Sequence, residues 1–315
     1  MPRLALLFLV WLPLVAQDGA DPTAEAAALR SLIARTPRFN LYLTIFRITP
    51  PREGWDLGMV SSVAVDAKGV VYLLQRGDRA DPVIAVSPEG RVLRSWGRGL
   101  YRMPHSLRLD PQGNIGTTDA ATSRVIKFAP DGKKLLEIAA GGQPDPCRNN
   151  FCGTTDVAFG PNGRVFVTDG YANARVLEYN SRGKPVRQWG RAGTGPGEFH
   201  LPHSIAIDPG GVVYVADREN GRIQRFDLEG RYLGEWQDFG KTFGLEVHGE
   251  ALWIGTQPRN EPNGSPGWVL KIDRRTGKLL GQIDAVANHF VAVTDRDEVF
   301  SVPGRGGIQW FREGR

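Results

Sequence analysis

A repeat of four short strands runs from about residue 55 to the end of the chain, and it constrains the fold more than any other feature. Each repeat has an apolar alternating strand, a tight turn, a second strand, a loop, a third strand, a glycine turn and a fourth strand. The residues that end the first strands are Asp66, Asp110, Gly160, Asp208, His248 and Thr294, at spacings of 44, 50, 48, 40 and 46 residues. Four-stranded units of this length are typical of a β-propeller. We therefore predict one all-β, six-bladed propeller, although 315 residues alone would suggest two domains.

The two turns within each repeat, and the end of its fourth strand, have recurring residues. The first turn is close to Asp-x-x-Gly, as in "DPQG" ending at Gly113, and the later turn ends in glycine, as in "RTG" at Gly277. Tight hairpins need a residue with positive φ, which glycine adopts without steric cost. Several fourth strands end on tryptophan, as in "VLRSWG" and "PVRQWG".

The sixth repeat stops at "GIQWF" after three strands, so the ring needs a strand from elsewhere. The segment "FNLYLTIFRIT" (39–49) alternates well enough to be that strand. We expect it to complete the last blade, which gives a propeller over residues 39–315. Residues 17–38 are then a tether, with a short helix expected at 23–34 from the spacing of Leu29, Leu32 and Ile33.

Residues 1–16 have the pattern of an export signal. Arg3 is followed by the apolar segment 4–16, which ends at Ala16, a small residue at a plausible cleavage point. Thirteen apolar residues are fewer than the roughly 20 that a membrane-spanning helix needs. We expect a mature chain from Gln17, exported to the periplasm or secreted, without a stable membrane span; an uncleaved anchor is the alternative.

The charge pattern argues against a nucleic-acid partner. The formal net charge is +5 with a pI near 9.3, but basic and acidic residues are scattered along the chain and no run of five like charges occurs. The sequence gives no indication of oligomeric state.

Three of the five histidines occupy one position of the repeat. His105, His203 and His289 each lie five residues before the marker of blades 2, 4 and 6. The slot opens the first strand of a blade, which lines the central channel of a propeller. Alternate blades of a sixfold ring place equivalent residues about 120° apart, so the three imidazoles are expected to converge as metal ligands. Imidazole suits zinc, copper, iron or nickel, and without a thiolate zinc is the first choice.

The alternative is that these histidines are structural. A single Pro-His-Ser at a strand start is more often a turn histidine bonded to the backbone. Three in the same slot of alternate blades favour a metal site.

A second set of residues lies at, or directly after, one position of the repeat. Arg76 in blade 1 and Arg218 in blade 4 lie ten residues after their markers, and Tyr171 of blade 3 lies one residue further along the same count. Blades 1 and 4 are opposed, so both guanidiniums can reach one anionic ligand, whose carboxylate a guanidinium matches in two-point fashion. The alternative is that Arg218 pairs with Asp217 or Glu219 on the rim and Tyr171 only packs.

These segments resemble a known family. "QRGD", "MPHSLRLD", "FCGTTDVAF", "TDGYANARV", "LPHSIAID" and "VADRENGRIQRF" are similar to the NHL-type propeller of peptidyl-α-hydroxyglycine α-amidating lyases, over residues 55 to 313. The resemblance implies cleavage of a peptide's C-terminal α-hydroxyglycine to a peptide amide and glyoxylate. It implies zinc on His105, His203 and His289. It also implies that Tyr171 acts as the base, with nearby cations lowering the pKa of its phenol, and that Arg76 and Arg218 bind the substrate carboxylate and the developing charge.

The chain departs from the family at its calcium site. The resemblance implies calcium held by backbone carbonyls at Val63 and Leu107 and by an aspartate directly after the third histidine, but that residue is Phe290 here. The sequence therefore argues against calcium, and we expect the fold to tolerate its loss.

The two cysteines lie in the blade-3 loop "CRNNFC", as Cys147 and Cys152. In an exported protein a local disulfide is expected there, and it would stiffen the approach to Tyr171. The alternative is a pair of free or separately buried thiols.

Three classes of function remain open from the sequence. The first is a zinc lyase. The second is another metal-dependent propeller enzyme, such as a lactonase-like hydrolase, which three histidines argue against. The third is a non-enzymatic NHL-repeat platform that binds a protein or glycan, for which bound metal would be unnecessary.

Overall fold

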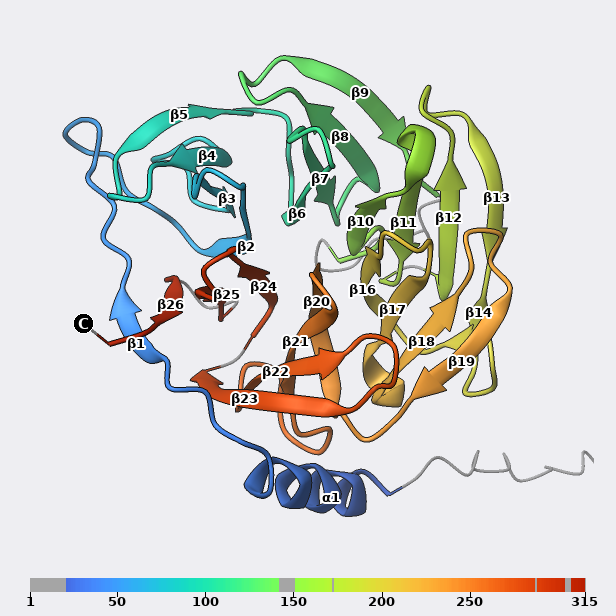
Figure 1. Ribbon diagram of the computed structural model, residues 1–315. Helices are drawn as coiled ribbons and strands as arrows, with labels where there is room; N and C mark the ends of the chain where they lie inside the picture. The colour runs from blue at the N-terminus through green and yellow to red at the C-terminus, as the bar shows by residue number, and fades with distance from the viewer. Residues whose placement is uncertain (1–20, 142–150, 172, 287, 304–306, 315) are drawn as a thin grey trace, which may run out of the picture.

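In the computed structural model, which describes residues 21–141, 151–171, 173–286, 288–303 and 307–314, six four-stranded antiparallel sheets surround a central axis (Figure 1). The first strand of each sheet lies nearest the axis and the fourth lies at the rim (Figure 1). The predicted six-bladed propeller is confirmed. The export segment, residues 1–16, lies outside the described residues. Within the described ranges, no helix is both long and apolar enough to cross a membrane.

The strands of the first three blades follow one another along the chain. Blade 1 comprises β2 (Val60–Val65), β3 (Val71–Gln75), β4 (Val83–Val86) and β5 (Val92–Trp96). Blade 2 comprises β6 (Pro104–Leu109), β7 (Ile115–Asp119), β8 (Arg124–Phe128) and β9 (Lys134–Ala139). Blade 3 comprises β10 (Asp156–Phe159), the 3-10 turn η1 (Pro161–Gly163), β11 (Val165–Asp169), β12 (Arg175–Tyr179) and β13 (Pro185–Trp189).

The other three blades include one strand from the N-terminus. A two-stranded parallel ladder, β14 (Arg191–Ala192) with β15 (Glu198–Phe199), leads into blade 4. Blade 4 comprises β16 (Pro202–Ile207), β17 (Val213–Asp217), the 3-10 turn η2 (Arg218–Asn220), β18 (Arg222–Phe226) and β19 (Tyr232–Trp236). Blade 5 comprises β20 (Lys241–His248), β21 (Ala251–Gln257), β22 (Pro266–Asp273) and β23 (Leu279–Val286). Blade 6 comprises β24 (Phe290–Val293), β25 (Val299–Val302), β26 (Gln309–Arg312) and β1 (Tyr42–Ile45).

Strand β1 closes the ring, as the incomplete last repeat predicts. It pairs antiparallel with β26, from Tyr42 opposite Arg312 to Ile45 opposite Gln309. The strand is shorter than the expected 39–49, because β26 offers only four residues for pairing. The flanking residues bridge neighbouring blades instead, Arg38 to Gln282 and Thr49 to Arg91.

The tryptophans that end fourth strands and the glycines of the later turns contact each other between neighbouring blades. Each tryptophan that ends a fourth strand lies against the later-turn glycine of the next blade, as Trp236 does against Gly277. Gly277 has φ +76°, and a Cβ there would lie 2.5 Å from the indole nitrogen of Trp236. Any larger residue would therefore be strained and would also collide with the neighbouring blade.

Helix α1 (Pro22–Ala34) lies outside the ring, beside blade 5 (Figure 1). Asp21 caps it by accepting a hydrogen bond from the backbone of Thr23 at 2.9 Å. Leu29 and Ile33 are buried in one cluster with residues of blades 4 and 5, so the helix packs on the propeller.

Candidate metal centre and active site

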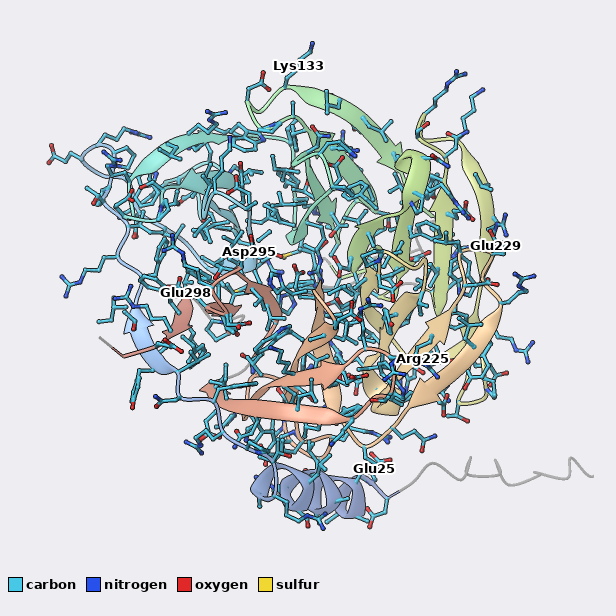
Figure 2. All side chains as sticks on the ribbon, viewed as in Figure 1. Glu25, Lys133, Arg225, Glu229, Asp295 and Glu298 are labelled. Atoms are coloured by element: carbon cyan, nitrogen blue, oxygen red, sulfur yellow. The ribbon has the colours of Figure 1, made fainter. Side chains whose placement is uncertain are left out.

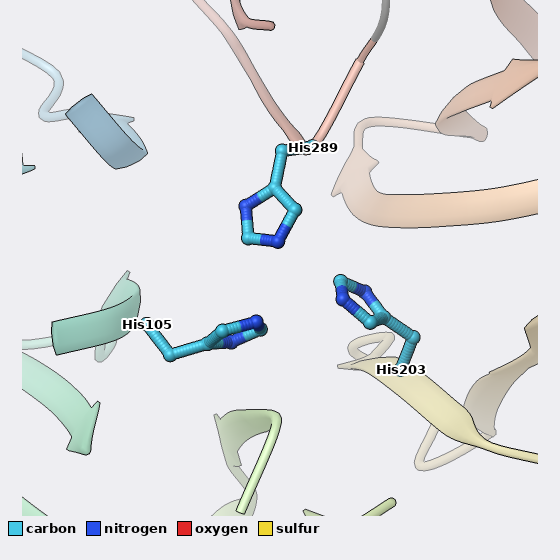
Figure 3. A group of neighbouring side chains, drawn as sticks. All are labelled: His105, His203 and His289. Atoms are coloured by element: carbon cyan, nitrogen blue, oxygen red, sulfur yellow. The ribbon is translucent and has the colours of Figure 1, made fainter. Parts of the chain in front are cut away.

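Three imidazoles meet in the central channel. His105 lies in β6, His203 in β16, and His289 directly before β24. Their ring centroids are 4.7 to 5.1 Å apart, and one nitrogen of each lies within 4.8 Å of the others. Figure 3 shows the three rings pointing toward one another from separate blades. The structure thus brings together the histidines that the repeat position predicts to converge.

The blades between them fix the orientation of each imidazole. Each Nδ1 lies 2.5 to 2.7 Å from a backbone carbonyl, and the pairs are His105 with Thr155, His203 with Phe243, and His289 with Ser61. Because a carbonyl only accepts, each Nδ1 carries the proton and the Nε2 lone pair is left for a ligand. The three carbonyls belong to the residues that occupy the histidine slot in blades 3, 5 and 1.

The electrostatics keep the imidazoles in the ligating form. Burial and, to a smaller extent, the nearby Arg76 lower the pKa of His289 to about 3. Burial and the neighbouring histidines hold the pKa of His105 well below its usual value, and burial with Arg218 does the same for His203. All three are neutral at pH 7, as metal binding requires.

Tyr171 lies against the imidazoles. Its hydroxyl is 2.9 Å from Nε2 of His105 and 3.2 Å from Nε2 of His203. Burial raises the pKa of this phenol, and the cations Arg218 and Arg76 oppose the rise without overcoming it. The expectation that nearby cations lower the pKa of Tyr171 is therefore corrected for the metal-free chain, because burial outweighs them. The hydroxyl is protonated and donates toward an Nε2 lone pair.

One cavity of about 180 Å³ is lined by four of the predicted site residues, Arg76, Tyr171, Arg218 and His289. It is lined by Met59, Arg76, Phe151, Tyr171, Arg218, Phe243, Gln257, Asn263, Gly264, Asn288, His289 and Pro303. The aromatic and aliphatic lining was not predicted. Phe243 shares the histidine slot, but the others come from positions that the repeat does not mark.

Arg76 has an unused donor at this cavity. Its Nε donates to the carbonyl of Pro104 at 2.9 Å, and its guanidinium lies 5.5 Å from the ring centre of Phe151. Its Nη2 is buried without a hydrogen-bond partner in the described structure. A buried, unpaired guanidinium nitrogen is costly, and an anionic ligand would satisfy it.

Arg218 is paired but buried. It lies in η2, and its Nε and Nη2 are 2.8 and 2.7 Å from Oε1 of Glu219. The guanidinium carbon is 4.9 Å from the ring centre of Phe243. The pairing with Glu219 that the alternative interpretation expected is present, but Arg218 is only 6% exposed, so it belongs to the cavity wall and not to the rim.

A second charged cluster lies in the same channel, three residues further along β6. Arg108 is buried and donates from Nε and Nη2 to Asp156, with the shortest contact at 2.6 Å. It also donates to Glu246 at 3.1 Å and to Ser204 at 2.9 Å. Its guanidinium carbon lies 5.0 Å from the ring centre of Phe290. We call Arg108, Asp156, Ser204 and Glu246 the guanidinium cluster.

The calcium site that the resemblance implies does not fit these residues. Phe290 offers no oxygen, and the guanidinium of Arg108 lies against its ring. The carbonyl of Leu107 accepts from the hydroxyl of Ser62 at 3.3 Å, and Val63 is paired within β2 and β3. Phe290 stands where the resemblance implies a carboxylate ligand, so no step is assigned to calcium.

The predicted disulfide cannot be placed from the described residues, because Cys147 lies outside them. Cys152 is buried, 3% exposed, at the start of the segment that leads to blade 3. The bridge stays a prediction.

Comparison with known proteins agrees with this architecture. A family described as a 6-bladed beta-propeller matches residues 156–252. A Caenorhabditis elegans protein named "Probable peptidyl-alpha-hydroxyglycine alpha-amidating lyase pgal-1" is 30% identical over 313 residues, covering 88% of this chain and 84% of its own length. The "Peptidyl-glycine alpha-amidating monooxygenase" of Mus musculus is 38% identical over 203 residues, 55% of this chain. The match spans only 21% of the mouse protein.

A solved structure titled "Streptogramin B lyase structure" superposes with a TM-score of 0.57. It is 14% identical and the match covers 87% of this chain and 98% of that one. At that identity the likeness concerns the fold alone.

Proposed function

The chain belongs to the peptidyl-α-hydroxyglycine α-amidating lyase family, and from that premise we propose that it is a metal-dependent carbon–nitrogen lyase. We propose that it cleaves the C-terminal α-hydroxyglycine of a peptide into a peptide amide and glyoxylate. The observation that carries the proposal is the meeting of three neutral imidazoles in the channel, where one of them, the Tyr171 phenol and two guanidiniums line a small cavity.

The donor set suits zinc. His105, His203 and His289 offer three oriented Nε2 atoms and no thiolate, and the cavity leaves room for a substrate ligand. When bound, the ion would supply Lewis acidity at the substrate hydroxyl and a positive charge that favours ionisation of the Tyr171 phenol.

The chain's own residues supply the proton transfer. Tyr171, ionised, takes the proton of the substrate hydroxyl. The O–H electron pair forms the carbonyl of glyoxylate while the carbon–nitrogen bond breaks. Its electron pair stays on the amide nitrogen, which takes up a proton. The reaction needs no oxidant or reductant, because the products together have the composition of the substrate.

The arginines hold the substrate. Nη2 of Arg76, at the cavity wall, has no hydrogen-bond partner in the described structure, and the carboxylate of a C-terminal α-hydroxyglycine would supply one. Arg218 contributes a second positive charge from blade 4, beside the same phenol. Both charges favour the anionic substrate over a neutral analogue.

The experiment is a measurement of metal content and glyoxylate release on the purified chain, beside Tyr171→Phe. We expect about one zinc per chain in both proteins, and turnover of a peptidyl α-hydroxyglycine that falls by roughly 10²–10⁴-fold in the variant. Tyr232→Phe, on the rim, is the matched control and should behave like the wild type. A Tyr171→Phe variant with wild-type turnover would contradict the role of the phenol. A chain with no metal and no turnover would favour a binding platform.

We further propose that the chain is exported, on the pattern of residues 1–16 alone. Fractionation of a host that expresses the full chain, with N-terminal sequencing of the product, would test it. A cytosolic product that begins at Met1 would contradict it.

A further inference from the structure

We propose that helix α1 is a brace, outside the ring, that positions the wall of the cavity formed by Arg218 and the loop 258–265. Its kinetic consequence rests on the proposed function, but the brace itself is a property of the fold. Figure 2 shows Glu25 on the side of the helix that faces the propeller.

The helix is anchored by apolar packing. Leu29 is fully buried and Ile33 is 6% exposed, in one cluster with Phe239 of the segment before β20. Leu29 lies beside Gly240, where a Cβ would come within 2.8 Å of the leucine side chain and 2.4 Å of the carbonyl oxygen of Gln257. The helix is therefore seated directly against the base of the loop that follows Gln257.

Two ion pairs join the helix to that loop. Nη1 of Arg259 lies 2.6 Å from both carboxylate oxygens of Glu25, and both side chains are less than a fifth exposed. Arg30, further along the same helix, pairs with Glu261. Partial burial makes the first pair stronger than an ordinary surface pair.

The braced loop forms part of the cavity wall. Gln257, Asn263 and Gly264 line the cavity beside Arg218. The side chain of Gln257 holds the loop from inside, donating to the carbonyl of Pro262 at 2.8 Å and accepting from the backbone of Gly264 at 3.0 Å. The loop thus has an inner support from Gln257 and an outer support from α1.

The same contacts reach Arg218. Gly221 ends η2 with φ +68°, and a Cβ there would lie 2.8 Å from Cδ of Arg259, so the arginine that pairs with Glu25 lies on the turn that carries Arg218. Lys241 provides a second link. Its Nζ is 3.7 Å from Glu219, the partner of Arg218, and 3.3 Å from the carbonyl of Glu261.

The brace should affect substrate binding more than the chemical step. The histidines and Tyr171 lie on blades 2, 3, 4 and 6. Each histidine is held by a backbone carbonyl, and the Tyr171 hydroxyl contacts two of the imidazoles. Arg218 and the loop form the wall that a substrate contacts. Loosening that wall lowers the fraction of chains ready to bind, which raises KM while kcat stays nearly constant.

The test compares Glu25→Gln with Arg38→Gln. Arg38 pairs with Asp284 from the same N-terminal segment, but both side chains are more than half exposed and neither lines the cavity. Hydrogen–deuterium exchange of residues 218–221 and 258–265 is measured on the zinc-loaded full chain, together with steady-state kinetics on a peptidyl α-hydroxyglycine and zinc content.

We expect exchange in both segments to rise roughly fivefold in Glu25→Gln only, and KM to rise about three- to tenfold with unchanged zinc and kcat within about twofold. Exchange equal to that of the wild type and of Arg38→Gln would overturn the brace. Raised exchange with unchanged KM would overturn its role in substrate binding. If the wild type shows no turnover, the proposed function fails, and the exchange result still decides whether α1 braces the loop.

Discussion

Two levels of one channel use the same inner strands in opposite ways. At the histidine level, three Nε2 atoms converge on one point and a buried nitrogen of Arg76 has no partner in the described structure. At the guanidinium cluster, three residues along β6, Arg108 donates to two carboxylates and a hydroxyl and lies on an aromatic ring. The histidine level has nitrogen atoms available to a ligand, whereas the charged groups of the guanidinium cluster are paired with one another.

This difference in hydrogen bonding distinguishes a ligand-binding site from a cluster that only stabilises the fold. A buried polar group without a partner costs free energy, so it persists where a ligand will satisfy it. A buried charge that is fully paired needs no ligand and instead ties its neighbours together. The guanidinium cluster joins blades 2, 3, 4 and 5 through Arg108, Asp156, Ser204 and Glu246. The two levels should therefore respond differently to substitution.

The largest effect is expected from His203→Ala. Removing one of three ligands should abolish stoichiometric metal binding and lower glyoxylate release by at least about hundredfold, with the fold retained. Elemental mass spectrometry and a glyoxylate assay check this. His248→Ala is the matched control, because His248 lies near Asp295 and away from the cavity. Stoichiometric metal in His203→Ala would show that the histidine level is structural after all.

Arg108→Met should lower stability instead of metal content. It leaves the carboxylate of Asp156 buried and uncompensated, which costs about 3–5 kcal/mol of unfolding free energy. Urea unfolding of the metal-free protein measures it, and Arg231→Met, at a side chain 77% exposed, should change stability by less than about 1 kcal/mol. The double variant Arg108→Met with Asp156→Asn should recover part of the loss. A cost for Arg108→Met no larger than the control's would remove the distinction between the two levels.

Glu246→Gln should have a smaller and pH-dependent effect. Burial, with a smaller contribution from Asp156, raises the pKa of Glu246 to about 7 even though Arg108 opposes the rise. Because the folded-state pKa is above the unfolded value of 4.5, the proton stabilises the fold fully below about pH 4.5, and this contribution is lost as the pH rises through about 7. Tm of the variant relative to the wild type should therefore increase from pH 5 to pH 8. A Tm difference that does not vary with pH would contradict this.

Calcium should have the smallest effect of all. With Arg108 and Phe290 in the channel, added calcium should not change Tm of the zinc-loaded protein, because a ligand stabilises only a fold that binds it. Magnesium is the control for ionic strength. A calcium-specific rise in Tm would show that a second cation binds despite the guanidinium cluster.

The fold could be predicted because the repeat carries geometric information. A period of 40 to 50 residues fixes the blade, and the missing strand of the last repeat identifies β1 as the closing strand. The same period converts sequence position into angle around the axis. His105, His203 and His289 could therefore be brought together without knowledge of any contact.

The electrostatics of Tyr171 could not be predicted in the same way. The sequence shows two cations at related repeat positions, which would lower the pKa of the phenol. It does not show how deeply the phenol is buried, and burial is the larger influence. The pairing of Arg218 with its neighbour Glu219 was foreseen, but its burial in the cavity wall was not.

By itself, the sequence determined the number of blades, the closing strand and the position of every side chain proposed to bind metal or substrate, because these depend on periodicity. Only the tertiary structure decided which nitrogen of each histidine bonds to the backbone and which is left for a metal, because the partners are backbone carbonyls that any residue could supply. It alone placed Arg108 against Phe290 and Glu25 against Arg259, because residues 182 and 234 positions apart meet only when the ring closes.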